Sequence, residues 1–401
     1  MTSRLFARRR RGICGLLVLT VATMCDAGAA TLAIGIVQRA DDDRLDPARV
    51  ALAYPGQPGG RVRDAVDMAI QESRFELEAA GLKTVVSVRD TKSADDAAVQ
   101  LRQLDKAGAN AALLDLPAAW IAAASAATAM PVLNVGESAD APRQQGCRSN
   151  LFHTLPSDRM RADALAQALL WRKWMRVLLL AGPRAEDATG LALAQAALKR
   201  YGLRQVATKS FRLSADPRER DLANPLLLTG SAVAGGDYDV VWVIDSDGEF
   251  ARTLPYRIAL PRPVVGDAGM TAQAWAPNFE RYGAPQLARR FARAARRPMT
   301  SHDWAAYVAT KAVLQAALTR PAHIAAAGLN AVLNTPDFAL DGVKGVRLSF
   351  RSWDHQLRQP MLLSDGVAVI GTAPVDGVMH AKNVLDTLGT DAPESPCKAA
   401  P

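Results

Sequence analysis

Short apolar segments rich in branched residues alternate with longer amphipathic segments along most of this chain, and this alternation limits the possible folds more than any other feature. Residues 32–38 (LAIGIVQ) are typical of a buried strand, and residues 59–80 then carry apolar side chains at near-helical spacing. Repeats of this cycle predict strands and helices in turn at 84–88, 94–107, 111–116, 117–129 and 132–135. Such alternation indicates βαβ units and a parallel sheet.

A second series of the same kind follows a polar linker at residues 137–150. Its strands are predicted at 151–155, 177–180, 205–211, 238–244 and 264–266, and its helices at 157–174 and 189–201. Residues 276–334 are predicted to be mostly helical, and residues 343–371 alternate as in an antiparallel hairpin. The length of 401 residues fits two or three domains. We therefore expect an α/β protein built from two lobes of similar size.

The N-terminal segment has the organisation of a secretory signal. Arg4 and Arg8 to Arg11 precede an apolar run from Ile13 to Met24, and small residues follow at 27–30. This run is too short to remain as a membrane-spanning helix. We expect residues 1–29 to be removed near Ala29 and the mature chain to reside in the periplasm.

The positive charge of the chain lies partly in this segment. The sequence carries 48 Lys and Arg against 40 Asp and Glu, a formal charge of +8 that suggests nucleic-acid binding. Removal of residues 1–29, which contain five Arg and one Asp, leaves 43 basic and 39 acidic residues, a net charge of +4. The mature chain therefore gives no reason to expect a nucleic-acid partner.

Two of the four cysteines, Cys14 and Cys25, belong to the segment that is expected to be removed. Lipid attachment at Cys25 is an alternative, but Met24 stands where a small residue is normally found. Cys147 and Cys397 remain in the mature chain. An even pair of cysteines in an oxidising compartment is more often a disulfide than two free thiols, so we predict a bond between them.

The sequence specifies no reaction. HExxH, GxSxG, Walker A and GxGxxG motifs are absent, and the five histidines show no metal-ligand spacing. His153 lies within an apolar segment and is interpreted as an interior histidine. The basic stretch 289–297 (RRFARAARR) is typical of a solvated helical face, with acidic lipid or a partner as the alternative. We therefore predict no enzymatic activity and no cofactor.

Four segments together resemble the leucine-binding branch of the type I periplasmic binding proteins, which are the substrate-binding components of ABC transporters. They are PVLNVG (131–136), GCRSNLFHTLPSDRMRADALAQAL (146–169), RPVVGDAGMTAQAW (262–275) and SHDWAAYVATKAVLQAAL (301–318). They are most similar to a subgroup associated with pyrroloquinoline quinone (PQQ)-dependent alcohol catabolism. The resemblance covers Leu32 to about Leu388.

The resemblance implies two Rossmann-like lobes joined by a hinge that the chain crosses three times, near residues 148, 270 and 339. Lobe 1 would contain 31–145 and 273–338, and lobe 2 would contain 150–268 and 341–388. A C-terminal tail would occupy 389–401. Cys147 would then lie at the first crossing, so the predicted disulfide would hold the tail beside the hinge.

Ligands of open α/β sheets bind beyond the carboxyl ends of the strands, where loops and helix N-termini present amide donors. The residues expected there, and therefore predicted to bind the ligand, are Asp90, Asp115, Asn134, Asp245, Asp267 and Trp275. Their carboxylates would suit a hard cation, a polyol or an amine. The alternative for each Asp is that it caps the turn in which it lies.

One departure from the amino-acid-binding relatives affects the expected ligand. Those receptors usually have a small loop rich in Gly and Ser after the third strand, whereas this chain has Asp115-Leu116-Pro117-Ala118. Pro117 supplies no amide hydrogen. A free amino acid is therefore not the expected ligand.

We accordingly predict a monomeric receptor that delivers a small molecule or metal ion to an ABC permease. The subgroup suggests an alcohol-derived compound, the quinone cofactor itself or a metal that the dehydrogenase requires. Two other hypotheses remain: a sensory module that reports to a membrane kinase, and an accessory periplasmic enzyme.

Overall fold

The structure, a computed structural model, describes residues 29–212, 216, 224–232 and 235–397. All of the predicted signal segment except Ala29, and the last four residues of the predicted tail, lie outside these ranges. Within the described ranges, no helix combines the length and the apolar character needed to cross a membrane.

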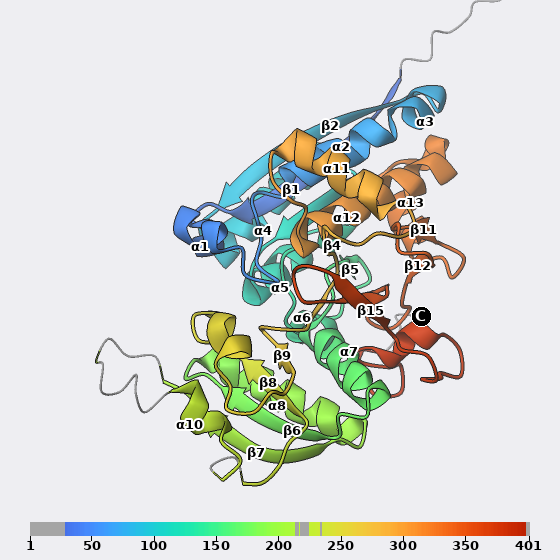
Figure 1. Cartoon of the computed structure of the whole chain (residues 1–401). Coiled ribbons are helices and arrows are strands. Elements are labelled where there is room, and N and C mark those ends of the chain that lie inside the picture. The colour runs from blue at the N-terminus through green and yellow to red at the C-terminus, as the bar shows by residue number, and fades with distance from the viewer. Residues whose placement is uncertain (1–28, 213–215, 217–223, 233–234, 398–401) are drawn as a thin grey trace, which may run out of the picture.

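A five-stranded parallel sheet forms the centre of the first lobe, with strand order β2-β1-β3-β4-β5 (Figure 1). Its strands are β1 (Ala30–Arg39), β2 (Leu82–Thr91), β3 (Ala111–Asp115), β4 (Val132–Asn134) and β5 (Leu151–His153). β3 is buried along its whole length and β1 along most of its length, as expected for strands covered on both faces.

Helices cover both faces of this sheet. The N-terminal helices that follow the strands are α2 (Arg63–Glu72), α3 (Arg74–Ala79), α4 (Ala94–Lys106) and α5 (Ala118–Ala126). Three later helices complete the lobe: α11 (Ala284–Ala295), α12 (Ser301–Thr319) and α13 (Ala326–Leu333). α12 packs against α2 and is buried on nearly every side, and Thr300 and Asp303 form a capping box at its start. Short helices η1 (Asp43–Leu45), α1 (Pro47–Leu52) and α6 (Ala141–Gln144) lie in the loops.

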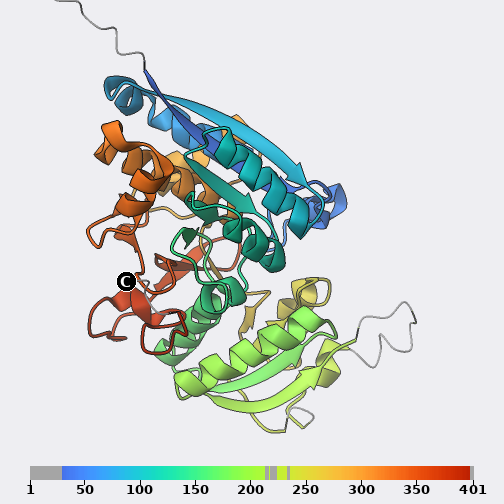
Figure 2. The same cartoon turned by 180° about the vertical axis from the view of Figure 1, so that it is seen from behind.

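The second lobe has a four-stranded parallel sheet of order β7-β6-β8-β9 (Figure 2). Its strands are β6 (Arg176–Ala181), β7 (Arg204–Ser210), β8 (Val240–Ile244) and β9 (Val264–Gly266). The long helices α7 (Asp158–Trp171) and α8 (Ala185–Arg200) pack together on one face. The other face is covered partly by α10 (Pro225–Thr229) and η2 (Ala251–Tyr256), where the rings of Phe211 and Phe250 stack with centroids 4.0 Å apart.

The strand-helix alternation was predicted correctly, but three assignments were wrong. Residues 151–155 were assigned to the second series, whereas β5 pairs with β4 at the edge of the first sheet. The helix predicted at 59–80 is two helices that meet at Ser73. The hairpin predicted at 343–371 is two separate antiparallel sheets, with orders β11-β12-β13 and β10-β14-β15. Local periodicity does not specify the partner of a strand, because pairing is decided by segments far away in the sequence.

These two small sheets lie beside the connection between the lobes (Figure 1). They contain β10 (Thr271–Gln273), β11 (Leu340–Asp341), β12 (Arg347–Phe350), β13 (Leu357–Arg358), β14 (Met361–Ser364) and β15 (Val369–Ala373), and η3 (Pro321–His323) and η4 (Val384–Thr387) flank them. Leu357 packs in the core of the first lobe, and Leu363 packs in the core of the second. The last passage between the lobes therefore lies between these two residues and not near residue 339, where it was expected, because Leu340 and Leu348 also pack in the first core. The first two passages follow β5 and β9.

The first passage is organised by Arg143, whose side chain is only 3% exposed. Its guanidinium donates to the carbonyl oxygens of Ala139 at 2.6 Å and Leu155 at 2.8 Å, and to Oε1 of Gln356 at 2.7 Å. Burial lowers the pKa of Arg143, although several nearby carboxylates oppose this. One buried cation in α6 thus connects the loop before α6, the segment before α7 and the segment before β13.

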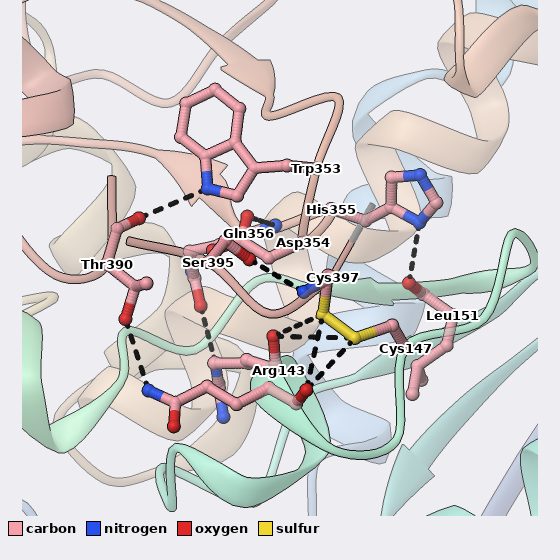
Figure 3. Close-up of a disulfide and its surroundings, with 11 residues drawn as sticks. Arg143, Cys147, Leu151, Trp353, Asp354, His355, Gln356, Thr390, Ser395 and Cys397 are labelled. Atoms are coloured by element: carbon pink, nitrogen blue, oxygen red, sulfur yellow. Dashed lines mark hydrogen bonds between the residues drawn. A yellow bond between two sulfur atoms is a disulfide. The ribbon is translucent and has the colours of Figure 1, made fainter. Parts of the chain in front are cut away.

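The predicted disulfide between Cys147 and Cys397 is present, with Cα atoms 5.8 Å apart (Figure 3). It attaches the C-terminal segment to the loop that follows α6. Thr390 in the same segment accepts hydrogen bonds at its carbonyl oxygen from Trp353 at 3.1 Å and from Arg351 at 3.4 Å. The end of the chain is therefore held beside the first passage between the lobes.

Candidate functional site

Two adjoining cavities lie between the lobes at the carboxyl ends of both parallel sheets. Their volumes are about 260 Å³ and about 500 Å³. The smaller is bounded mainly by the first lobe and the larger mainly by the second. Both are lined by Gly56, Gln57, Glu137, Ser138 and Arg161, so they form one continuous cleft.

Arg44, in the loop after β1, supplies much of the first lobe's wall. Its guanidinium bonds to Oδ2 of Asp42 and Oδ1 of Asp115, each at 2.7 Å, and to the carbonyl oxygen of Gly136 at 3.0 Å. Burial alone would raise the pKa of Asp42, but Arg44 outweighs this effect and the pKa is lowered. A Cβ on Gly136 would lie 2.0 Å from Oδ1 of Asp115, so this close approach requires glycine.

Glu137 occupies the N-terminus of helix α5. One of its carboxylate oxygens accepts from the backbone N–H of Ala118 and the other from that of Ala139, both at 2.8 Å. A carboxylate at this position is favoured by the free amides and the dipole of the helix. The chain's own carboxylate therefore fills the place where helix α5 could hold an anionic group of a ligand.

His302, in the first turn of α12, lines the smaller cavity and is 7% exposed. Its Nδ1 is buried and has no hydrogen-bond partner. Burial, assisted by the nearby Arg44 guanidinium, lowers the pKa of His302 to about 4, and the neighbouring carboxylates only partly oppose this. The imidazole is therefore neutral at physiological pH, with one ring nitrogen unpartnered.

The wall of the second lobe is dominated by carboxylates. Asp187 and Asp245 are 1% and 3% exposed, and they accept from the backbone N–H groups of Ser246 at 2.7 Å and Ala251 at 2.8 Å, respectively. Burial raises the pKa of Asp245, and it raises that of Asp267 to about 6. These residues hold the loops after β6 and β8 in place, which agrees with the capping alternative, while lining the larger cavity.

Two of the six residues predicted to bind a ligand, Asp245 and Asp267, line the cleft. Asp115 and Asn134 lie behind its wall, where Asp115 supports Arg44 and Asn134 accepts from the backbone N–H of Glu137 at 3.0 Å. Asp90 accepts from Gln38 at 2.8 Å and lies outside both cavities. Trp275 is 1% exposed in the core of the first lobe, and its Nε1 has no partner.

Four cleft residues were not among those predicted to bind a ligand: Arg44, Glu137, Arg161 and His302. Arg44 and Glu137 do lie in the strand-end loops that were expected to face the ligand. Arg161 and His302 lie in the first turns of α7 and α12, directly after helix-capping Ser157 and Thr300. The predicted helix at 157–174 therefore began at the right end of α7, but nothing in the sequence indicated that Arg161 or His302 would line the cleft.

No group of three or more His, Cys, Asp or Glu side chains in the described ranges is arranged to hold a metal ion. Asp187, Asp245 and Asp267 of the second lobe instead accept hydrogen bonds from backbone amides of the segment that follows β8. The strand-end carboxylates therefore do not converge as the hypothesis of a hard-cation site requires.

No family model and no curated protein sequence matches the chain. Solved structures do. The periplasmic ligand-binding protein of a branched-chain amino acid ABC transporter from Burkholderia xenovorans LB400 is 16% identical over 92% of this chain and 99% of its own, with a TM-score of 0.72. The fold is that of the type I periplasmic binding proteins.

Two further structures show the same likeness. An ABC transporter substrate-binding protein from Sphaerobacter thermophilus is 13% identical over 86% of this chain and 98% of its own, with a TM-score of 0.68. A solute-binding protein of an R. palustris ABC transporter, solved in complex with benzoate, is 14% identical over 86% of this chain and 96% of its own, with a TM-score of 0.61. In this fold, the cleft between the lobes is the candidate functional site.

Proposed function

We propose that this chain is the periplasmic solute-binding component of an ABC transporter. It captures a small ligand in the cleft between its lobes and delivers it to a permease in the inner membrane, without catalysis. The observation that carries the proposal is the continuous cleft, which is lined from both lobes at the carboxyl ends of their sheets. Structural neighbours that are ABC transporter substrate-binding proteins support it.

Several finer features belong to the same proposal. The chain is exported by a signal segment cleaved near Ala29 and acts as a monomer. Its lobes contain approximately the ranges that the resemblance implies, except that β5 and the segment from 341 to Leu357 belong to the first lobe. The link to PQQ-dependent alcohol oxidation rests on sequence resemblance alone, and it directs the search for a ligand toward compounds present during growth on alcohols.

Native mass spectrometry of the protein, purified from the periplasm without refolding, tests this function. We expect one small molecule to be retained per chain and to be lost on unfolding. Ser138→Trp should abolish retention, because Ser138 lines both cavities and the indole would fill space between the lobes. Gln71→Trp, on the exposed surface of α2, is the matched control and should retain the molecule.

Small-angle scattering provides the second readout. Ligand binding should reduce the radius of gyration, since the lobes close around the ligand, and should raise Tm by mass action. The proposal fails if no periplasmic extract or compound produces closure and the wild-type protein and Ser138→Trp retain the same molecules.

A further inference from the structure

We propose that the ligand of this cleft is a small organic cation that carries a protonated amine. This inference rests on the proposed function, since it takes the cleft as the binding site and names the class of its solute. It departs from the ligand of the neighbour that was solved with benzoate, an organic anion.

The first observation is the charge of the cleft. Seven carboxylate side chains line the two cavities, against three guanidinium groups and the neutral His302. The carboxylates belong to Glu137, Asp158, Glu186, Asp187, Asp245, Asp247 and Asp267. With residues 1–29 removed, as proposed, the chain has a formal charge of +4, so the cleft is acidic within a mildly basic protein. A cleft lined by one sign of charge attracts ligands of the opposite sign.

The three arginines do not form a site for an anion, because each is already paired with two carboxylates. Arg44 contacts Asp42 and Asp115, both at 2.7 Å. Arg161 contacts Asp158 at 3.4 Å and Asp267 at 3.8 Å. Arg39 contacts Asp42 at 3.9 Å and Asp43 at 3.0 Å. An incoming carboxylate would have to compete with these pairs for the same guanidinium groups.

The helix terminus in the cleft is also unavailable to an anion. Glu137 already accepts from Ala118 at the start of α5, and Pro117 has no amide hydrogen to offer. A ligand carboxylate placed there would displace the Glu137 carboxylate or lie beside it. Two negative charges in contact repel each other. The N-terminus of α5, which could otherwise bind an acidic ligand, therefore carries a negative charge that disfavours such a ligand.

By contrast, the cleft offers acceptors and aromatic rings to a cation. The carboxylates of Asp187 and Asp245 line the larger cavity, and the contacts given for them in the described structure are to backbone amides rather than to basic side chains. Trp242 and Tyr54 line the same cavity, and aromatic faces attract ammonium groups. The neutral His302, with Nδ1 unpartnered and the side chain more than nine-tenths buried, lines the adjoining cavity and can accept an N–H.

The test uses sets of compounds that share a carbon skeleton of similar size and differ in the charge of the polar group. Calorimetry would compare benzylamine with benzyl alcohol and benzoate, and butylamine and 1,4-diaminobutane with their alcohols and acids. We expect the amine to bind at least about tenfold more tightly than the alcohol or acid of its set, with a stronger preference at low salt. The inference is overturned if an alcohol or acid binds as tightly as its amine, or if no amine in the panel binds.

Variants assign the preference to the cleft. Asp158→Asn removes charge from a partly exposed position and Glu186→Gln from an exposed one on the second lobe's wall, and each should weaken amine binding by about threefold or more. Glu76→Gln, exposed on α3, is the matched control and should bind like the wild type. Unchanged amine binding in both cleft variants would also overturn the inference.

The outcomes separate this inference from the proposed function. An acid or alcohol that binds and closes the lobes refutes the cationic ligand and leaves the solute receptor intact. Absence of any retained molecule and of any closure, in the experiments described for the function, refutes the receptor itself.

Discussion

Replacement of both Cys147 and Cys397 by alanine removes the covalent bond between the C-terminal segment and the loop after α6. The two residues are 250 positions apart, so the bond closes a loop that contains the whole of the second sheet. In the folded protein, the tail would still be held by the contacts of Thr390 and by the ion pair between Arg159 and Glu394. The main effect should therefore fall on the unfolded state.

The loop length sets the size of this effect. The chain-entropy relation gives about 5.5 kcal/mol for a loop of this length, and measured losses on removing native disulfides are about 2 to 5 kcal/mol. The entropy of unfolding is about 2.1 cal/mol/K per residue, and the mature chain has roughly 370 residues. A change of about 0.8 kcal/mol in the free energy of unfolding therefore shifts Tm by one degree. The double variant should thus melt about 3 to 6 °C below the wild type.

Thermal unfolding followed by circular dichroism measures this difference. Reductant should lower the Tm of the wild type toward that of the variant and leave the variant unchanged, and thiol titration should find no free thiol in the untreated wild type. Because both cysteines lie outside the two cavities, ligand affinity should be unaffected. The reasoning is refuted if the fully oxidised wild type and the variant melt within about 1 °C of each other.

Three further changes test the buried charges. Glu137→Gln should cost about 0.5 to 1 kcal/mol in urea unfolding, since it removes the negative charge at the start of α5, and equal stability would contradict this. Arg143→Met should cost about 3 to 5 kcal/mol, because it removes a buried guanidinium and leaves Oε1 of Gln356 and the carbonyl oxygen of Ala139 without this donor, and a loss under about 1 kcal/mol would contradict it. Burial raises the pKa of Asp163 to about 6, above its unfolded value, so this residue contributes stability at pH 4 that is lost as the pH rises through 6. Asp163→Asn should flatten that slope in urea unfolding measured from pH 4 to 7, and an unchanged slope would contradict the assignment.

Much of the architecture was predictable because it depends on local patterns. Apolar segments such as 111–116 and helix signals such as Ser157 act over a few residues, and the structure places β3 and the start of α7 there. The disulfide was predictable from the number of cysteines and the compartment, and the structure forms it. The small sheets after residue 340 were not, because each of their strands has several possible partners and only packing selects among them.

The same distinction applies to the site. The sequence by itself determined that two α/β lobes would form and that their strand-end loops would surround a cleft, since strand direction and helix caps are encoded locally. Only the tertiary structure decided which side chains reach that cleft. Arg44 faces it because Asp115, 71 residues away, pairs with Arg44 from behind, and Glu137 caps α5 across 19 residues of chain. Ion pairs and hydrogen bonds between distant segments, which leave no periodic pattern in the sequence, set the chemistry of this surface.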